Sequence, residues 1–358
     1  MTGGAVRREP PPSAGGGWRR LALTDDRLEV AGAVSTRHGP GGLQPWRLQH
    51  RDLDLHHPSL LGPGACPAGV RLRLRSDTTR LRLRLAASES VPGPHPRVVP
   101  LCDLAVDGEL RTTRVMPPSG EIEFGGLDGT TAVLEVWLPT APALRIILVE
   151  VDRGARVEPL PPDRQPGWAV YGSSLTHGVG LSPARTWTAL AARAAGRRSY
   201  CLGYDGGAHL DPQVAAAIGE LPVEVITLEI GINVHLAGSF TGRTFAPAVH
   251  GFLDRIRLRQ PAALVVVVPP LLSPAHEATQ PEHGLSLAEI RAQLAQIVEL
   301  RRRRGDAALH QVVTTDLLDD PELFPDGLHL SAAGHRELAR RYLECESRLV
   351  DRPGPIPA

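Results

Sequence analysis

Residues 172–178, Gly-Ser-Ser-Leu-Thr-His-Gly, form the segment of this sequence whose residue types are best suited to chemistry. The segment follows a short apolar run, residues 168–171, and leads into helix-like sequence. A serine placed where a buried strand ends and a helix begins exposes its hydroxyl at the sheet edge, beside free backbone N–H groups that stabilise developing negative charge. The segment therefore predicts a nucleophile turn with Ser173 and Ser174 as candidates, although similar glycine- and serine-rich strings also form plain loops.

A serine hydroxyl is a poor nucleophile, so it needs a base, a group that orients the base, and donors for the oxyanion. His329 is the candidate base, and Asp326 lies three residues before it in a Pro-Asp-Gly turn, close enough to hold the second imidazole nitrogen. The backbone N–H groups of Ser174 and Gly206 and the side-chain amide of Asn233 are candidates for an oxyanion hole. Each residue taken singly also fits an ordinary turn, loop or cap, so their order along the chain is the stronger signal.

Three further histidines lie in or beside the loops that carry these residues. They are His177, His209 and His235. Because none has an identifiable carboxylate to orient its ring, we expect them to line a substrate pocket rather than to act as catalytic bases.

The composition argues against several other classes of function. The 358-residue chain has a formal net charge of +0 and 42% hydrophobic residues, so neither a nucleic acid nor a membrane is expected as a partner. All 39 residues counted as lysine or arginine are arginine, which excludes a lysine Schiff base. The four cysteines lack the spacing of a zinc or redox motif, so the sequence predicts no metal and no cofactor. Neither a secretion signal nor a membrane span is apparent, which predicts a cytoplasmic protein.

The hydrophobic pattern divides the chain into two domains between flexible ends. Residues 1–17 and 349–358 are expected to be a disordered N-terminal tail and a flexible C-terminal tail. Short segments with a period of two fill residues 18–158 and predict an all-β sandwich, jelly-roll-like in outline. Within it, the alternating runs 70–74 and 80–85 are expected to pair as a hairpin with leucines on one face and arginines on the other.

After a proline-rich linker, residues 159–166, apolar runs alternate with helical segments over residues 167–348. The run 264–268 is β-branched and nearly unbroken, as expected for a central parallel strand covered by helices on both faces. Ser286 and Glu289 predict a capping box at the start of a long helix. The second domain is therefore expected to be a three-layer α/β/α sandwich with a parallel sheet, and ligands should bind beyond the carboxyl ends of its strands.

Four separate blocks of the sequence resemble those of the SGNH (GDSL) serine hydrolase superfamily. The blocks are residues 172–176, 202–206, 231–233 and 326–329. The resemblance implies Ser174 as the nucleophile and Asp326 with His329 as the rest of a catalytic triad. It also implies Gly206 and Asn233 as oxyanion donors.

One position departs from this pattern, because Ser173 stands where the superfamily commonly has aspartate. The spacing of the blocks favours Ser174 over Ser173 as the nucleophile. Upstream, residues 70–79, 103–108 and 135–139 are similar to an actinobacterial subgroup that carries an N-terminal β-sandwich. That subgroup includes an acyltransferase that tailors a tetracycline-type polyketide.

The residues and the resemblance together predict a serine-dependent acyl ester hydrolase of the GDSL esterase or lipase type, with the acyl group carried on Ser174. One alternative is an acyltransferase that moves an acyl group from a thioester or ester to a hydroxyl of a natural product or sugar. A second is a carbohydrate-binding protein with an inactive hydrolase domain, which the intact set of site residues disfavours. The expected partner is a small-molecule ester, a thioester, or an acylated sugar or polyketide.

Overall fold

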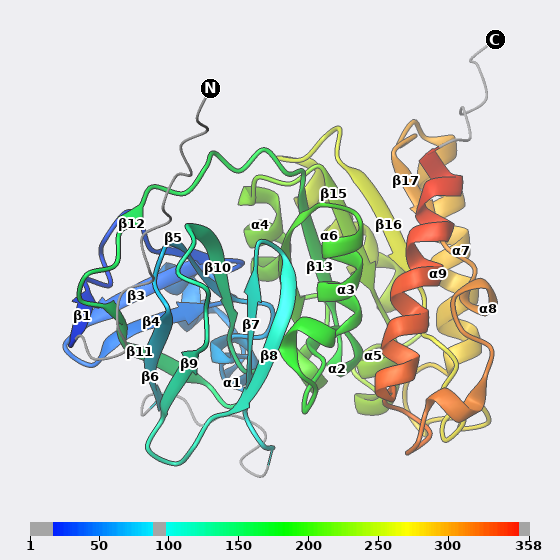
Figure 1. Cartoon of the computed structure of the whole chain (residues 1–358). Helices are drawn as coiled ribbons and strands as arrows, with labels where there is room; N and C mark the ends of the chain where they lie inside the picture. The colour runs from blue at the N-terminus through cyan, green and yellow to red at the C-terminus, as the bar shows by residue number, and fades with distance from the viewer. Residues whose placement is uncertain (1–16, 89–97, 351–358) are drawn as a thin grey trace, which may run out of the picture.

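Two domains lie side by side in the computed structural model, which describes residues 17–88 and 98–350 (Figure 1). Of the expected tails, residues 1–16 and 351–358 lie outside these ranges. The last helix continues through Val350, where the sequence pattern had predicted a flexible end from residue 349.

The N-terminal domain consists of two antiparallel sheets and two short helical segments. The strands are β1 (Trp18–Leu21), β2 (Glu29–Ala31), β3 (Ser35–Gly39), β4 (Gly42–Trp46), β5 (Arg71–Ser76), β6 (Arg80–Ala87), β7 (Leu101–Val106), β8 (Glu109–Val115), β9 (Glu121–Gly125), β10 (Ala132–Trp137), β11 (Leu144–Asp152) and β12 (Val157–Glu158), and the helical segments are η1 (His50–Leu55) and α1 (Pro58–Ala65). One sheet has the order β3-β4-β11-β6-β9 with β1 beside β11, and the other has the order β12-β5-β10-β7-β8 with β2 beside β5. The predicted all-β domain is thus a two-sheet sandwich.

The predicted hairpin between residues 70–74 and 80–85 is wrong. β5 pairs with β10, β2 and β12, whereas β6 pairs with β11 and β9, so the two strands belong to opposite sheets. Their leucines face each other across one buried core, which includes Leu72 and Leu83. Alternation reveals that one face of a strand is buried but not which strand it pairs with, and a sandwich satisfies the same pattern as a hairpin.

The C-terminal domain is built on five parallel strands in the order β14-β13-β15-β16-β17. They are β13 (Gly167–Gly172), β14 (Arg198–Gly203), β15 (Val225–Glu229), β16 (Leu264–Val268) and β17 (Leu309–Gln311). The helices are α2 (Ser174–His177), η2 (Pro183–Arg185), α3 (Trp187–Ala194), η3 (Asp205–Gly207), α4 (Pro212–Glu220), α5 (Ile232–Ala237), α6 (Phe245–Arg257), α7 (Leu287–Arg303), α8 (Thr314–Leu317), η4 (Pro321–Leu323) and α9 (Ala332–Val350).

Helices cover both faces of this sheet, which gives the predicted three layers. Successive residues of β13 alternate between two cores, with Ala169 and Tyr171 in one and Trp168 and Val170 in the other. Helices α4, α6 and α7 fill the first core, and α3 and α9 fill the second (Figure 1). Because both faces are buried, the strands read as continuous apolar runs.

Helix α7 begins as the sequence predicts. The Ser286 hydroxyl accepts a hydrogen bond from the Glu289 N–H at 3.2 Å, and a Glu289 carboxylate oxygen accepts one from the Ser286 N–H at 2.8 Å. The helix ends near Gly305, whose φ of 101° is readily adopted by glycine. No helix among the described residues is long and apolar enough to cross a bilayer.

A buried arginine joins the sandwich to the edge of the parallel sheet. Arg47, which follows β4, is fully buried and donates to the carbonyl oxygens of Cys66 at 2.6 Å and Cys201 at 3.1 Å. It also donates to the carbonyl oxygen of Gly203, the last residue of β14. The Tyr204 hydroxyl in turn donates to the Arg47 carbonyl oxygen at 2.6 Å. The two domains therefore share one hydrogen-bonded junction at the carboxyl end of β14.

The buried imidazole of His335 in α9 provides a pH-dependent link between α9 and α3. Its Nδ1 accepts a hydrogen bond from the Trp187 N–H at 3.1 Å, and burial lowers the pKa of His335 from 6.5 to about 4. Because the unfolded chain takes up this proton more readily, stability that is present above pH 6.5 is lost as the pH falls towards 4.

We therefore expect the free energy of unfolding to fall by about 3 kcal/mol more between pH 6.5 and pH 4 in the wild type than in His335→Gln, whose amide oxygen can still accept from Trp187. Urea denaturation of both proteins across this pH range measures the difference. Parallel pH profiles would show that His335 does not carry the effect.

Candidate active site

The serine-containing turn connects β13 to α2 at the carboxyl edge of the parallel sheet. Ser173 is the N-cap of α2, where its hydroxyl accepts a hydrogen bond from the Leu175 N–H at 3.2 Å. Ser174 is the first residue of α2, and Gly178 in the left-handed conformation ends the helix after one turn. The Ser173 side chain is buried, whereas Ser174 is partly exposed. Of the two adjacent serines, only Ser174 is placed where a substrate could reach its hydroxyl.

The structure brings Ser174, His329 and Asp326 together in one hydrogen-bonded chain. His329 Nε2 lies 3.0 Å from the Ser174 hydroxyl oxygen, and His329 Nδ1 lies 2.7 Å from an Asp326 carboxylate oxygen. An ionised carboxylate only accepts hydrogen bonds, so the Nδ1 proton points to Asp326 and Nε2 is left to accept from the serine hydroxyl. This arrangement can take a proton from the hydroxyl and stabilise the imidazolium that forms.

Backbone hydrogen bonds keep Asp326 ionised and in place. The second carboxylate oxygen accepts from the N–H groups of Leu328 at 2.9 Å and His329 at 2.6 Å. Partial burial alone would raise the pKa of Asp326, but the hydrogen bonds from His329 and Leu328 outweigh it and lower the pKa from 3.8 to about 2. Asp326 is therefore a carboxylate throughout the neutral pH range.

The loop after β16 fixes the turn that carries Asp326 and His329. Gly327, at φ 77°, accepts hydrogen bonds on its carbonyl oxygen from the Ser273 hydroxyl at 2.9 Å and the Ala275 N–H at 3.1 Å. A Cβ at position 327 would come 2.8 Å from the Ala275 Cβ, so the close approach of the two loops also requires glycine.

A buried carboxylate beneath the nucleophile turn was missed by sequence reasoning. Glu229, the last residue of β15, is 3% exposed and accepts from the Ser173 N–H at 2.7 Å and from the Ser173 hydroxyl at 2.8 Å. It also accepts from the Thr176 hydroxyl at 3.1 Å. Burial raises the pKa of Glu229, and the hydrogen bonds from Ser173 and Thr176 oppose that rise. The sequence signal was an acidic residue at the end of a mostly apolar strand, just before the Gly-Ile-Asn block.

Gly206 and Asn233 lie on the loops that follow β14 and β15. Gly206 is exposed in η3, and a Cβ there would meet open space. The Asn233 side chain is 5% exposed, and its amide oxygen accepts from the Ala208 N–H at 3.0 Å. That hydrogen bond leaves the amide NH₂ as the donor end and ties Asn233 to the loop that carries Gly206.

The three additional histidines occupy different environments. His209 is partly exposed and bridges the Gly206 carbonyl oxygen and the Ser239 hydroxyl, both at 2.9 Å, so it holds the loop of Gly206. His235 is 3% exposed, and its Nδ1 lies 2.9 Å from the Leu285 carbonyl oxygen.

His177 does not fit the expected pocket lining. Its ring is fully buried at the contact between the domains, where Nε2 lies 2.7 Å from the carbonyl oxygen of Thr140 in the sandwich. Within the described ranges, no cluster of histidine, cysteine, aspartate and glutamate could hold a metal ion.

Comparisons with known proteins agree with this architecture. A model described as the GDSL-like Lipase/Acylhydrolase family matches residues 170–337, and a model of the SsfX3 N-terminal domain matches residues 28–146. The structure of the salicylyl-acyltransferase SsfX3 from a tetracycline biosynthetic pathway is 33% identical with a TM-score of 0.83, and the match covers 94% of this chain and 98% of that one. A comparison with curated proteins found no match.

Two more distant structures share the fold. One is described as a GDSL-like lipase from Bacteroides ovatus, with 17% identity, a TM-score of 0.76, and coverage of 93% of this chain and 98% of that one. The other is a family two carbohydrate esterase from Clostridium thermocellum, with 14% identity, a TM-score of 0.63, and coverage of 90% and 99%. With two family models matching its two domains and a 33% identical relative along most of its length, the chain belongs to the GDSL-like lipase/acylhydrolase family and carries an SsfX3-type N-terminal domain.

Proposed function

We propose that this ester-hydrolysing or acyl-transferring enzyme forms a covalent acyl group on Ser174 and hydrolyses small-molecule esters. The observation that carries the proposal is the hydrogen-bonded chain from the Ser174 hydroxyl through His329 to Asp326. The Ser174 oxygen attacks the ester carbonyl carbon while His329 Nε2 takes the hydroxyl proton. The carbon–oxygen bond to the leaving group then breaks, and His329 returns the proton to the departing alkoxide.

The acyl group leaves the enzyme in a second half-reaction with the same kind of steps, in which water is the nucleophile and Ser174 is the leaving group. Water attacks the acyl carbonyl, His329 takes a proton from that water, and the Ser174 oxygen departs with a proton. In both halves the carbonyl oxygen gains negative charge, for which we propose the N–H groups of Ser174 and Gly206 and the Asn233 amide as donors. The side chains of His329 and Asp326 are 49% and 56% exposed, so water reaches this centre, which supports hydrolysis.

Acyl transfer to an organic hydroxyl is the second candidate. It is supported by the 33% identity to a salicylyl-acyltransferase along both domains. Hydrolysis and transfer use the same serine, histidine and aspartate, so they differ only in whether water or a bound alcohol attacks the acyl group.

Labelling with a fluorophosphonate probe tests the nucleophile. We expect the wild type and Ser173→Ala to be labelled and Ser174→Ala to remain unlabelled, because the Ser173 hydroxyl is buried against Glu229 whereas Ser174 faces His329. Turnover of p-nitrophenyl acetate should fall by about 10⁴-fold or more in Ser174→Ala. An unlabelled wild type, or loss of labelling in Ser173→Ala alone, would contradict the assignment.

Replacement of Glu229 tests whether it positions the nucleophile turn. Glu229→Leu leaves the Ser173 and Thr176 donors without an acceptor and should lower the free energy of unfolding by about 3 kcal/mol. Glu229→Gln keeps one acceptor oxygen, so we expect it to stay folded and to lower kcat about tenfold with KM nearly unchanged.

Thr176→Val is the matched control, since it removes one of these hydrogen bonds and leaves the carboxylate. Its kcat should lie between those of the wild type and Glu229→Gln. Equal kcat values in the wild type, Glu229→Gln and Thr176→Val would show that Glu229 has a purely structural role.

Mass spectrometry of the acyl products distinguishes hydrolysis from transfer. Short-chain p-nitrophenyl esters and acyl-CoA are supplied as donors, with and without polyol acceptors, and the free acid and acylated acceptor are quantified. Hydrolysis predicts that free acid stays the main product when the acceptor is present. A main product of acylated polyol, absent in Ser174→Ala, would favour the transferase.

A further inference from the structure

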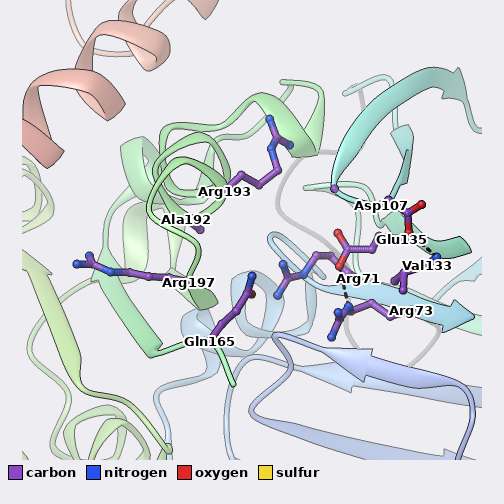
Figure 2. A pocket seen from close by; sticks show the side chains of 10 residues that line it. Arg71, Arg73, Asp107, Val133, Glu135, Gln165, Ala192, Arg193 and Arg197 are labelled. Carbon is purple, nitrogen blue, oxygen red and sulfur yellow. Dashed lines mark hydrogen bonds and ion pairs between the residues drawn. The ribbon is translucent and has the colours of Figure 1, made fainter. Parts of the chain in front are cut away.

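A cavity of about 380 Å³ lies between the two domains (Figure 2). Residues of β5, β10 and the turn at Asp107 line it from the sandwich, and the end of α3 with the linker residue Gln165 lines it from the other side. Its volume is in the lower part of the range for small-molecule sites, roughly 300–1,000 Å³. It is therefore large enough for a compact metabolite.

This cavity is separate from the serine centre. Gln165 lies just before β13 and Ser174 just after it, and a strand of six residues is about 20 Å long. Arg197, which follows α3 and lines the cavity, likewise directly precedes a strand, β14. The cavity thus lies at the amino end of the sheet, opposite the carboxyl edge that carries Ser174 and His329.

The lining is rich in positive charge. Four arginines contribute to it, against two acidic residues. Two of the arginines are neutralised: Arg73 pairs with Glu135 at 2.6 Å and with Glu29 at 2.7 Å, and Arg197 pairs with Glu346 at 2.7 Å.

Asp107, the second acidic residue, uses a carboxylate oxygen to accept a hydrogen bond from the Val133 N–H at 2.9 Å. The other two arginines are Arg71, which lines the cavity from β5 of the sandwich, and Arg193, which lines it from α3.

Arg71 and Arg193 have donors without acceptors. Within the part of the chain that the structure describes, buried Arg71 Nε and Arg193 Nη1 have no hydrogen-bond partner, and neither side chain forms an ion pair there. Arg71 is 6% exposed, and Figure 2 shows its side chain extending from β5 across the cavity towards Gln165.

Both guanidinium groups lie near the indole of Trp137. The guanidinium carbons of Arg71 and Arg193 lie 4.8 Å and 5.8 Å from the centre of its ring. The buried Trp137 Nε1 likewise lacks an acceptor among the described residues. Trp137 and the two arginines near its ring therefore each have a buried N–H donor without an acceptor among the described residues.

Buried N–H donors without acceptors lower the stability of the folded protein. Burial lowers the pKa of both Arg71 and Arg193, which reflects the cost of removing their charges from water. The face of an aromatic ring offsets part of that cost but supplies no hydrogen-bond acceptor. An oxyanion would supply both charge and acceptors, and guanidinium groups bind carboxylates and phosphates through paired N–H donors.

We propose that this junction cavity binds a compact dianion, either a phosphate group or a small dicarboxylate, through Arg71 and Arg193. One arginine comes from each domain, so the anion would also tie the sandwich to α3. The proposal goes beyond the acyl chemistry and does not rest on it, because the cavity is at the opposite end of the sheet.

Isothermal titration calorimetry of the full chain in a chloride buffer tests the site. Inorganic phosphate, glycerol 3-phosphate, succinate and acetate are titrated separately. We expect saturable one-to-one binding of at least one of the three dianions and at least about tenfold weaker binding of acetate. Binding of both phosphates without succinate identifies a phosphate site, and binding of succinate alone identifies a dicarboxylate site.

Arg193→Gln should weaken that binding by at least about tenfold, because one charge-assisted hydrogen bond is lost. The matched control is Arg255→Gln on α6, which removes the same charge far from the cavity and should bind within twofold of the wild type. Arg71→Met, which preserves packing on Trp137, is a second variant, with its folding checked by circular dichroism.

Ser174→Ala separates this site from the serine centre and should bind the dianion like the wild type. No saturable binding of any dianion would overturn the proposal. Equal binding by Arg193→Gln and Arg255→Gln would also overturn it, as would binding lost only in Ser174→Ala.

Discussion

The parallel register of β13 and β15 is the constraint on which the serine centre depends. Tyr171 lies opposite Leu228, so the next residues, Gly172 and Glu229, are neighbours where the two strands end. A Cβ at Gly172 would overlap the Glu229 carboxylate, and only glycine leaves room for it. The carboxylate then accepts from both the backbone and the hydroxyl of Ser173, which fixes the first turn of α2 and aims Ser174 at His329. A shift of one residue would remove this contact and bury a carboxylate without partners, at a cost that no surface interaction offsets.

The sandwich supports the same centre from the opposite side. Arg47 satisfies carbonyl oxygens at the end of β14, and Thr140 accepts from the buried ring of His177, the last residue of α2. The Arg47 contact thus links the N-terminal domain to the strand end before the loop of Gly206. The Thr140 contact links it to the turn that carries Ser174. Since a buried carbonyl or imidazole nitrogen left without a hydrogen bond is costly, the sandwich stabilises the parallel sheet and α2. The N-terminal domain therefore has a structural role that requires no ligand of its own.

Chain order alone was enough to predict that the candidate site residues lie at one edge of the sheet. Ser174, Gly206 and Asn233 lie just after parallel strands and His329 lies beyond the last one, and parallel strands end at one edge. Partnerships across elements could not be found in the same way. The alternating leucines in β5 and β6 are compatible with both a hairpin and a sandwich. Only the tertiary structure shows that the two strands belong to different sheets. His177 sits in the motif yet faces the other domain, and Glu229 looks like an isolated charge until the register sets it beneath Ser173. Arg71 and Arg193 belong to no motif, because they are far apart in the sequence and only the fold makes them line the same cavity.

In the proposed mechanism, the exposure of His329 and Asp326 bears on which reaction follows acylation of Ser174. Ser173 and Glu229 are buried and hold the turn that carries Ser174 in position, whereas the side chains of His329 and Asp326 are about half exposed. The buried side chains of Ser173 and Glu229 thus hold the turn that carries Ser174, whereas His329 and Asp326 are open to solvent. An enzyme of this design transfers an acyl group to an alcohol only if the bound alcohol displaces the water that reaches His329, since both nucleophiles use the same base. In the proposed mechanism, transfer in place of hydrolysis therefore depends on contacts that the loops around Ser174 make with the acceptor, because both reactions use Ser174, His329 and Asp326.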